Sequence, residues 1–239
     1  TANGYFSIGE WTASAFNMVK DWQLSSEINN RGSNDLKIVK SDNLYSFYIN
    51  NNFIYSTTII KTQGSYLGLM MSDAQRIEVD YVSFSPTNGE KSDLSTQDNY
   101  VEKKIESFTS KFDFSNVESS RFQDDFSDNR NQWSLFQKSD QSSVLQNGEL
   151  TLSRTLHEQK TVSIPNLACN FGSDFTLEVN AKWKYGIENN GYGLMFGAKN
   201  SSHFYSFVVT KSGYFSVGKY YDKDYADLIK WVEHTAIDP

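Results

Sequence analysis

FYSFVVTKSGYFSVGKY, residues 204–220, is the stretch that decides the fold. Phe204–Thr210 and Tyr214–Tyr220 are rich in aromatic and β-branched residues, which favour β-strands. Residues 211–213, Lys-Ser-Gly, form a turn signal between them, because glycine adopts chain-reversing backbone conformations at no steric cost. The sequence therefore predicts an antiparallel hairpin at this point.

The same pattern extends in both directions along the chain. Short apolar or alternating runs are separated by turns rich in Asn, Asp and Gly, and Asn147-Gly148 is the strongest hairpin signal among them. The predicted strands are Asp35–Lys40, Leu44–Ile49, Phe53–Thr57, Tyr66–Ser72, Gln75–Ser83, Val144–Leu145, Glu149–Arg154, Phe175–Trp183, Tyr192–Ala198, Phe204–Thr210 and Tyr214–Tyr220. Short strands at this even spacing predict an all-β, antiparallel sandwich or barrel.

Composition narrows the classes of function. A net charge of −7 argues against a nucleic-acid groove. The sequence lacks a run of about 18 apolar residues, so we expect no insertion into a membrane. The single cysteine, Cys169, excludes an internal disulfide framework and a cysteine-built zinc site, and we expect it to be buried. No signal-peptide pattern precedes Tyr5, so we expect a fragment or a processed chain.

Residues 3–30 and 212–239 repeat each other without a gap, 209 positions apart. Seven aligned residues are identical, which is more than average residue usage would produce by chance. The identical pairs are Gly4/Gly213, Tyr5/Tyr214, Phe6/Phe215, Ser7/Ser216, Gly9/Gly218, Trp22/Trp231 and Ile28/Ile237. We therefore predict that residues 1–85 are the C-terminal part of one module and residues 121–239 are the N-terminal part of the next.

Residues 86–120 are predicted to be a linker, because they are rich in Ser, Asn, Asp, Lys and Glu. Val101, Ile105, Phe108 and Phe112 recur within this segment at helical spacing and predict one short amphipathic helix. The helix has two interpretations. It rests on a neighbouring sheet, or it docks another subunit.

Several phrases of the sequence resemble a known family. DDF at 124–126, GYGL at 191–194, FYSF at 204–207 and IEVDYVSF at 77–84 resemble the laminin-G-like, concanavalin-A-like modules of bacterial surface and multidomain proteins. Carbohydrate-binding modules and keto-disaccharide-hydrolase-like domains belong to the same group. The resemblance implies a jelly-roll β-sandwich. The order of the phrases is rotated here, because the closing strands come first.

The rotated order predicts that residues 1–85 and 121–239 complete one sandwich, either within the chain or between chains. Half a sandwich would leave apolar edges and an open core face in water. One copy of the repeated strand is then surplus and can enter the sheet of another chain. Repeated head to tail, such an exchange makes a homo-oligomer, a ring or a filament.

Ligand binding is predicted from the aromatic residues. Sugars stack on flat aromatic side chains in a concave site with a few polar neighbours. The candidates are Tyr5, Trp11, Trp183, Tyr192 and Tyr205. The alternative for each is packing in the core or on a strand face. The predicted partner is a glycan or another cell-surface ligand, and the predicted location is extracellular or at the cell surface.

A structural calcium ion is also implied by the resemblance. Such modules hold calcium between the opening DDF segment and an aspartate of the closing strand, which correspond here to Asp80, Asp124 and Asp125. Calcium prefers six to eight hard oxygen ligands, and clustered carboxylates supply them. The alternative is that Asp125 and Asp128 form turns in a solvated loop.

Catalysis is not predicted, although the hydrolase-like relatives keep it as an alternative. Glycoside hydrolysis needs two carboxylates across a cleft. Glu178 has no acidic neighbour at strand spacing, and Glu78 has only Asp80. Three hypotheses follow: a non-catalytic carbohydrate-binding or adhesion module of a repeated extracellular protein, a structural subunit that assembles by exchange of half-modules, and a glycoside-processing hydrolase.

Overall fold

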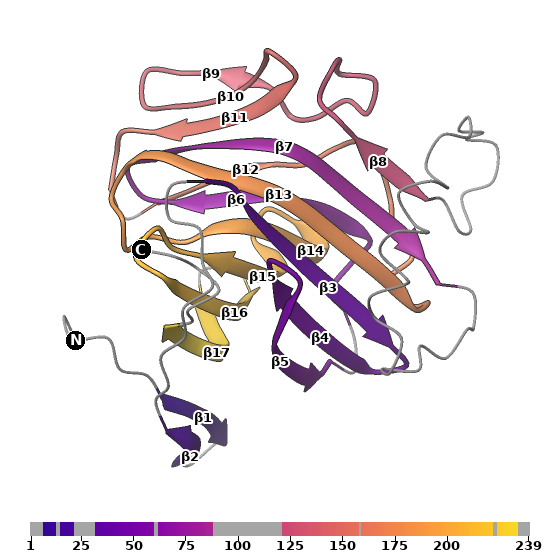
Figure 1. Cartoon of the computed structure of the whole chain (residues 1–239), viewed down its shortest axis with the longest axis vertical. Coiled ribbons are helices and arrows are strands. Elements are labelled where there is room, and N and C mark those ends of the chain that lie inside the picture. The colour runs from indigo at the N-terminus through magenta and orange to yellow at the C-terminus, as the bar shows by residue number, and fades with distance from the viewer. Residues whose placement is uncertain are drawn as a thin grey trace.

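The computed structural model describes residues 7–12, 15–21, 32–59, 62–87, 121–157, 159–221 and 224–233, and only the backbone before residue 22 (Figure 1). This part of the chain consists of strands without a helix. The strands are β1 (Ser7–Thr12), β2 (Ala15–Asp21), β3 (Asn34–Ser41), β4 (Leu44–Ile49), β5 (Asn52–Thr58), β6 (Tyr66–Ser72), β7 (Gln75–Pro86), β8 (Phe122–Asp124), β9 (Phe136–Gln137), β10 (Gln141–Gln146), β11 (Glu149–Arg154), β12 (Lys160–Ser163), β13 (Phe175–Gly186), β14 (Tyr192–Asn200), β15 (His203–Val209), β16 (Tyr214–Tyr221) and β17 (Asp224–Glu233).

All strands pair in antiparallel fashion, in three sheets. The nine-stranded sheet has the order β5-β4-β3-β13-β7-β11-β10-β9, with β8 paired to β7. It runs from β9 at the top of Figure 1 to β5 in the lower half of the picture, above the β1–β2 hairpin. The six-stranded sheet has the order β12-β6-β14-β15-β16-β17, and β1 and β2 form a two-stranded sheet.

Both large sheets combine strands from residues 34–86 with strands from residues 122–233. In the nine-stranded sheet, β13 lies between β3 and β7, so that Leu177 pairs with Ile38 on one side and with Phe84 on the other. In the six-stranded sheet, β6 lies between β12 and β14. The two parts of this chain therefore share both sheets. Residues 88–120, which hold the predicted helix, lie outside the described residues.

The two large sheets pack face to face around an apolar core. Phe47 of β4 meets Phe207 of β15 with ring centroids 5.2 Å apart, and Tyr45 of β4 lies 6.0 Å from Phe196 of β14. All four side chains are at most 1% exposed. Burying a side chain of this size stabilises the fold by about 1.5–3 kcal/mol. The predicted all-β, antiparallel sandwich is confirmed at this level.

Local turn chemistry explains where several strands end. Asn147 and Gly148 have positive φ angles of 54° and 76° in the two-residue loop between β10 and β11, as the Asn-Gly signal predicted. The strands predicted at Leu44–Ile49 and Tyr66–Ser72 have those bounds as β4 and β6. No helix in the described residues is long and apolar enough to cross a membrane.

The six-stranded sheet has a second, outer face that points away from the shared core. On β15, Tyr205 and Phe207 belong to the core, whereas Phe204 and Val208 belong to a separate buried cluster. Met70 of β6 lies in this second cluster as well. Successive strand residues point to opposite sides, so these positions define the outer face.

Candidate functional site

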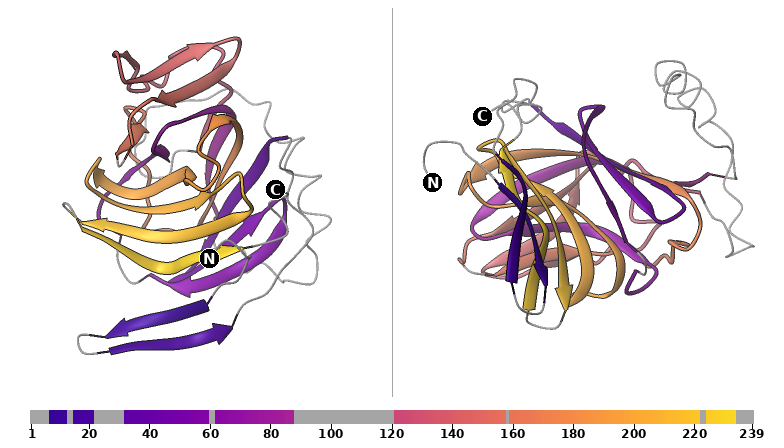
Figure 2. Two further views of the ribbon diagram at one scale, coloured as in Figure 1. Left: turned by 90° about the vertical axis from the view of Figure 1, so that its left-hand side faces the viewer. Right: turned by 90° about the horizontal axis from the view of Figure 1, so that it is seen from below.

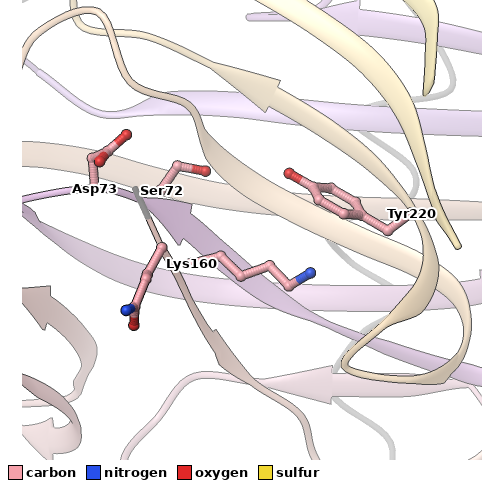
Figure 3. Close-up of a pocket in the computed structure, with 5 residues that line it drawn as sticks. Ser72, Asp73, Lys160 and Tyr220 are labelled. Atoms are coloured by element: carbon pink, nitrogen blue, oxygen red, sulfur yellow. The ribbon is translucent and has the colours of Figure 1, made fainter. Parts of the chain in front are cut away.

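A pocket of about 470 Å³ opens on the six-stranded sheet (Figure 3). Its lining residues are Ser72, Asp73, Gln159, Lys160 and Tyr220. Ser72 ends β6, Lys160 begins β12, and these two residues are opposite each other in the antiparallel ladder. The Asp73 amide donates to the Gln159 carbonyl at 2.8 Å. Main-chain pairing between β6 and β12 therefore fixes one side of the pocket.

Tyr220 of β16 supplies the opposite side, and its ring is held by two neighbours. It stacks on Phe204 of β15 with centroids 4.4 Å apart and planes 25° apart. Burial raises the pKa of the Tyr220 hydroxyl, while a hydrogen bond with Ser72 opposes that rise. Figure 3 shows the Ser72 and Tyr220 hydroxyl groups facing each other. This side of the pocket is therefore a fixed Tyr220 ring whose hydroxyl lies next to that of Ser72.

The ammonium group of Lys160 extends along these rings. Its Nζ lies 4.1 Å from the ring centroid of Tyr220 and 5.1 Å from that of Phe204. A cation over aromatic faces is attracted by the negative ring faces. No ion pair of Lys160 occurs within the described ranges. Burial lowers the pKa of Lys160, so the charged form gains from any anion that enters the pocket.

Arg154, at the end of β11, positions the Gln159–Lys160 side of the pocket. The guanidinium is buried, and it donates to Gln159 Oε1 at 3.1 Å and to the Lys160 carbonyl at 3.3 Å. It also donates to Thr161 Oγ1 at 3.0 Å and forms an ion pair with Asp140 at 3.6 Å. One buried side chain thus ties β11 to the first residues of β12.

A further polar group lies on the outer face near these residues. Ser206 of β15 stands between Phe204 and Val208 on this face and is 1% exposed. Its hydroxyl has no hydrogen-bond partner within the described part of the chain. An unpaired buried hydroxyl costs about 1–3 kcal/mol.

The predicted sugar-stacking residues do not come together at this pocket. Tyr5 lies outside the described residues, as does the side chain of Trp11. Tyr192 is 1% exposed and Tyr205 is 6% exposed, and both pack in the core. Neither ring has a free face for a sugar, so their prediction does not fit the structure. Trp183 is half-buried against the core, with Lys211 Nζ 5.6 Å from its ring centroid.

The pocket residues were missed by sequence reasoning because they come from three distant strands. Ser72, Lys160 and Tyr220 become neighbours only through long-range strand pairing. One signal did point to the place. The repeat aligns Tyr220 with Trp11, which was predicted to bind a ligand.

The predicted calcium ligands do not make a cation site in this structure. Asp124 is 4% exposed, and its carboxylate accepts from the Phe126 amide at 2.8 Å, from Asn131 Nδ2 at 2.7 Å and from Trp133 Nε1 at 2.6 Å. These N–H groups point their positive ends at the oxygens that calcium would need, so the residues around Asp124 do not fit the ion.

The other two predicted ligands, Asp80 and Asp125, are surface residues. Asp125 is exposed and accepts from the amide and hydroxyl of Ser127, as expected for the turn alternative. These hydrogen bonds hold the pKa of Asp125 below its usual range. Asp80 is exposed on β7. No group of three acidic, histidine or cysteine ligands occurs in the segments that the structure describes.

A pair of carboxylates that sequence spacing missed lies on the nine-stranded sheet. The Tyr81 hydroxyl lies 3.1 Å from Glu178 Oε1 and 3.2 Å from Asp35 Oδ1, and Asn180 Nδ2 donates to the same Asp35 oxygen at 2.7 Å. The residues come from β7, β13 and β3, so no local motif marks them. Burial and the two carboxylates raise the pKa of Tyr81. Because Tyr81 fills the space between the acids, we regard this group as a structural network.

Neither a protein-family model nor a curated protein matches this sequence. The geometry of the pocket and of the two sheets therefore carries the functional argument.

Proposed function

We propose that this chain is a non-catalytic carbohydrate-binding or adhesion module of a repeated extracellular protein. The binding site in this proposal is the pocket of Ser72, Asp73, Gln159, Lys160 and Tyr220. The proposal includes the jelly-roll form of the sandwich and the laminin-G-like, concanavalin-A-like resemblance of the sequence. It is supported by two packed antiparallel sheets and by a pocket on the outer face of one of them.

The observation that carries the proposal is the Lys160 ammonium beside the Tyr220 ring, without an acidic partner among the described residues. A sugar offers hydroxyls to Ser72 and Gln159, and its apolar C–H groups to the part of the half-buried Tyr220 ring that Phe204 and Lys160 leave uncovered. A carboxylate or sulfate on the sugar would pair with Lys160, and charge-assisted hydrogen bonds contribute about 1.5–3 kcal/mol. The expected ligand class is therefore an acidic sugar whose charged group lies at Lys160 and away from Asp73, the carboxylate that lines the same pocket.

Replacing Lys160 by methionine is expected to weaken binding of an acidic oligosaccharide by about ten- to a hundredfold, which corresponds to about 1.4–2.8 kcal/mol. Methionine keeps the apolar stem over the rings and removes the charge. A glycan array should first identify the acidic ligand, and calorimetry on the native and Lys160→Met chains should then give the dissociation constants.

The matched control is Lys219→Met. Lys219 also lies over tyrosine rings, at 5.8 Å from Tyr205 and 5.9 Å from Tyr221, but on the side of β16 opposite Tyr220. Its loss should leave affinity unchanged. Equal affinity of the native and Lys160→Met chains for an acidic glycan would exclude this pocket. Failure of every acidic and neutral glycan to bind would reject the proposed function itself.

The lowered pKa of Lys160 predicts opposite effects of alkaline pH on binding and on stability. Binding of an acidic sugar needs the charged ammonium, so affinity should fall as pH rises through the lowered pKa, earlier than for an exposed lysine. The folded chain releases the Lys160 proton before the unfolded chain does, so the Lys160 contribution to the free energy of unfolding rises with pH over the same window. Lys160→Met should remove both effects in calorimetry and urea unfolding.

A second candidate is the structural subunit that assembles by exchange between chains. It is favoured by one specific observation, the matching register of the two repeated hairpins, β1–β2 and β16–β17.

A further inference from the structure

The two repeated hairpins share the same backbone pairing. The cross-strand pairs of β1–β2 are Thr12↔Ala15, Trp11↔Phe16, Glu10↔Asn17, Gly9↔Met18 and Ile8↔Lys20. The pairs 209 positions later in β16–β17 are Tyr221↔Asp224, Tyr220↔Tyr225, Lys219↔Ala226, Gly218↔Asp227 and Val217↔Ile229. Both ladders shift register at the same place, between Ile8 and Gly9 and between Val217 and Gly218. The shared bulge gives β1–β2 the same pairing as β16–β17 from Ile8 to Thr12, whereas β16–β17 has a further shift between Phe215 and Val217.

β16 is the strand through which the second hairpin joins the six-stranded sheet. It pairs with β15 from His203↔Tyr221 to Val209↔Phe215, and Val217 is fully buried in the core. β1 has Ile8 at the register position of Val217 and Gly9 at the position of Gly218. It therefore carries the same residue types at these two register positions, an apolar residue followed by a glycine.

The two hairpins differ in the free energy of burial at one register position. Ile229 of β17 is 1% exposed in the core, and Lys20 holds its register position in β2. A lysine at a buried position costs free energy unless its ammonium is paired or reaches water. Within one chain, β16–β17 therefore packs beside β15 at a lower free energy than β1–β2 would. This agrees with the observed pairing of β16 with β15. The β1–β2 hairpin lies beyond β17 (Figure 2).

We propose that the β1–β2 hairpin of one chain takes the place of β16–β17 beside β15 of a second copy of the chain. Exchange of an identical element between copies is a low-cost route to association, and the exchange proposed here adds the cost of Lys20 at the position of Ile229. The displaced hairpin keeps its own two-stranded pairing but exposes Val217 and Ile229, so the exchange costs free energy and should be populated only at high chain concentration. The partner is a second copy because β16 and β17 stand between β1–β2 and β15 of the same chain.

The exchange would also change the pocket. Trp11 holds the register position of Tyr220, so the incoming β1 brings a tryptophan next to Phe204 and Lys160. Tryptophan is the aromatic residue that attracts a cation most strongly. Assembly and the chemistry of the pocket are therefore linked, although the exchange itself does not depend on sugar binding.

Cysteine cross-linking between two separately prepared variants tests the exchange. His203 is opposite Tyr221 in β15–β16, so an exchanged β1 places Thr12 opposite His203. Paired residues of antiparallel strands lie within disulfide distance. A mixture of Thr12→Cys and His203→Cys chains should form a disulfide-linked heterodimer that increases with concentration. Cys169 is buried, and its pKa is raised to about 12, so it should stay unreactive.

Two further variants set the direction of the effect. Lys20→Ile in the Thr12→Cys chain improves the fit of the incoming hairpin, so the heterodimer yield should rise about tenfold. Ile229→Lys in the His203→Cys chain weakens the resident hairpin, so the heterodimer yield should rise here as well. Leu156→Cys, at an exposed residue, replaces His203→Cys as the random-collision control. Heterodimer no higher than this control, even with Lys20→Ile, would overturn the proposal. Cross-linking confined to monomers of the Thr12→Cys/His203→Cys double variant would overturn the second copy as partner.

Discussion

Asp124→Ala is expected to lower the free energy of unfolding by about 3–5 kcal/mol, because it leaves buried donors without their shared acceptor. The Asp124 carboxylate joins the end of β8 to the following loop through the Phe126 amide and the side chains of Asn131 and Trp133. Trp133 Nε1 is buried beside it. Urea unfolding followed by tryptophan fluorescence gives the free energy directly.

The matched control is Asp125→Ala. Asp125 also accepts hydrogen bonds from its own loop, but it is exposed, so water can replace the lost acceptor. We expect its effect to be much smaller than that of Asp124→Ala. Similar losses in both variants would show that the buried carboxylate is not what stabilises this loop.

The Asp124 carboxylate also leads to an expected result for calcium removal. Since N–H groups already surround Asp124, a chelator should leave the melting temperature of the native chain unchanged. A melting temperature that falls with chelator and recovers with calcium would mean that the loop rearranges around the ion, and it would contradict the hydrogen-bonded arrangement.

The strands could be predicted because turn residues and alternation are local signals. Asn147 and Gly148 adopt the positive φ angles that their residue types favour, and β4 has its predicted bounds. β17 was missed for a physical reason. Its register shift spaces the buried residues Ile229 and Val232 three positions apart, so that the period of two is lost.

The site could not be predicted, because both faces of the six-stranded sheet are buried. On β15, Phe204 and Ser206 face outward while Tyr205 and Phe207 face the core, and all four are at most 6% exposed. A strand that is buried on both faces has no polar period to show which aromatic residue reaches a ligand. The contact between Lys160 and Tyr220 depends on the strand order of the whole sheet.

Arg154→Met is the second change with a large expected effect, and it links stability to the pocket. Removing the guanidinium leaves the Lys160 carbonyl, Thr161 Oγ1 and Gln159 Oε1 without this donor. Thr161 is buried, whereas Gln159 is exposed and Lys160 is half-buried, so water replaces part of the lost contacts and we expect a loss of about 1–3 kcal/mol in urea unfolding. Affinity for an acidic sugar should also fall more than tenfold, because β12 no longer holds Lys160 along the Tyr220 ring.

The control for this change is Arg76→Met on β7. Arg76 is 28% exposed and lies 3.5 Å from Glu78, so solvent can replace its contact, and it is not among the residues that line the pocket. It should alter unfolding only slightly and binding not at all. Binding and unfolding must both be measured below the melting transition of the Arg154→Met chain, so that lost affinity is not simply lost folded protein. The folded Arg154→Met chain could instead bind an acidic sugar as tightly as the native chain. Arg154 would then have a role in stability alone, and the contacts of Lys160 with the Tyr220 and Phe204 rings would be what holds Lys160 in position.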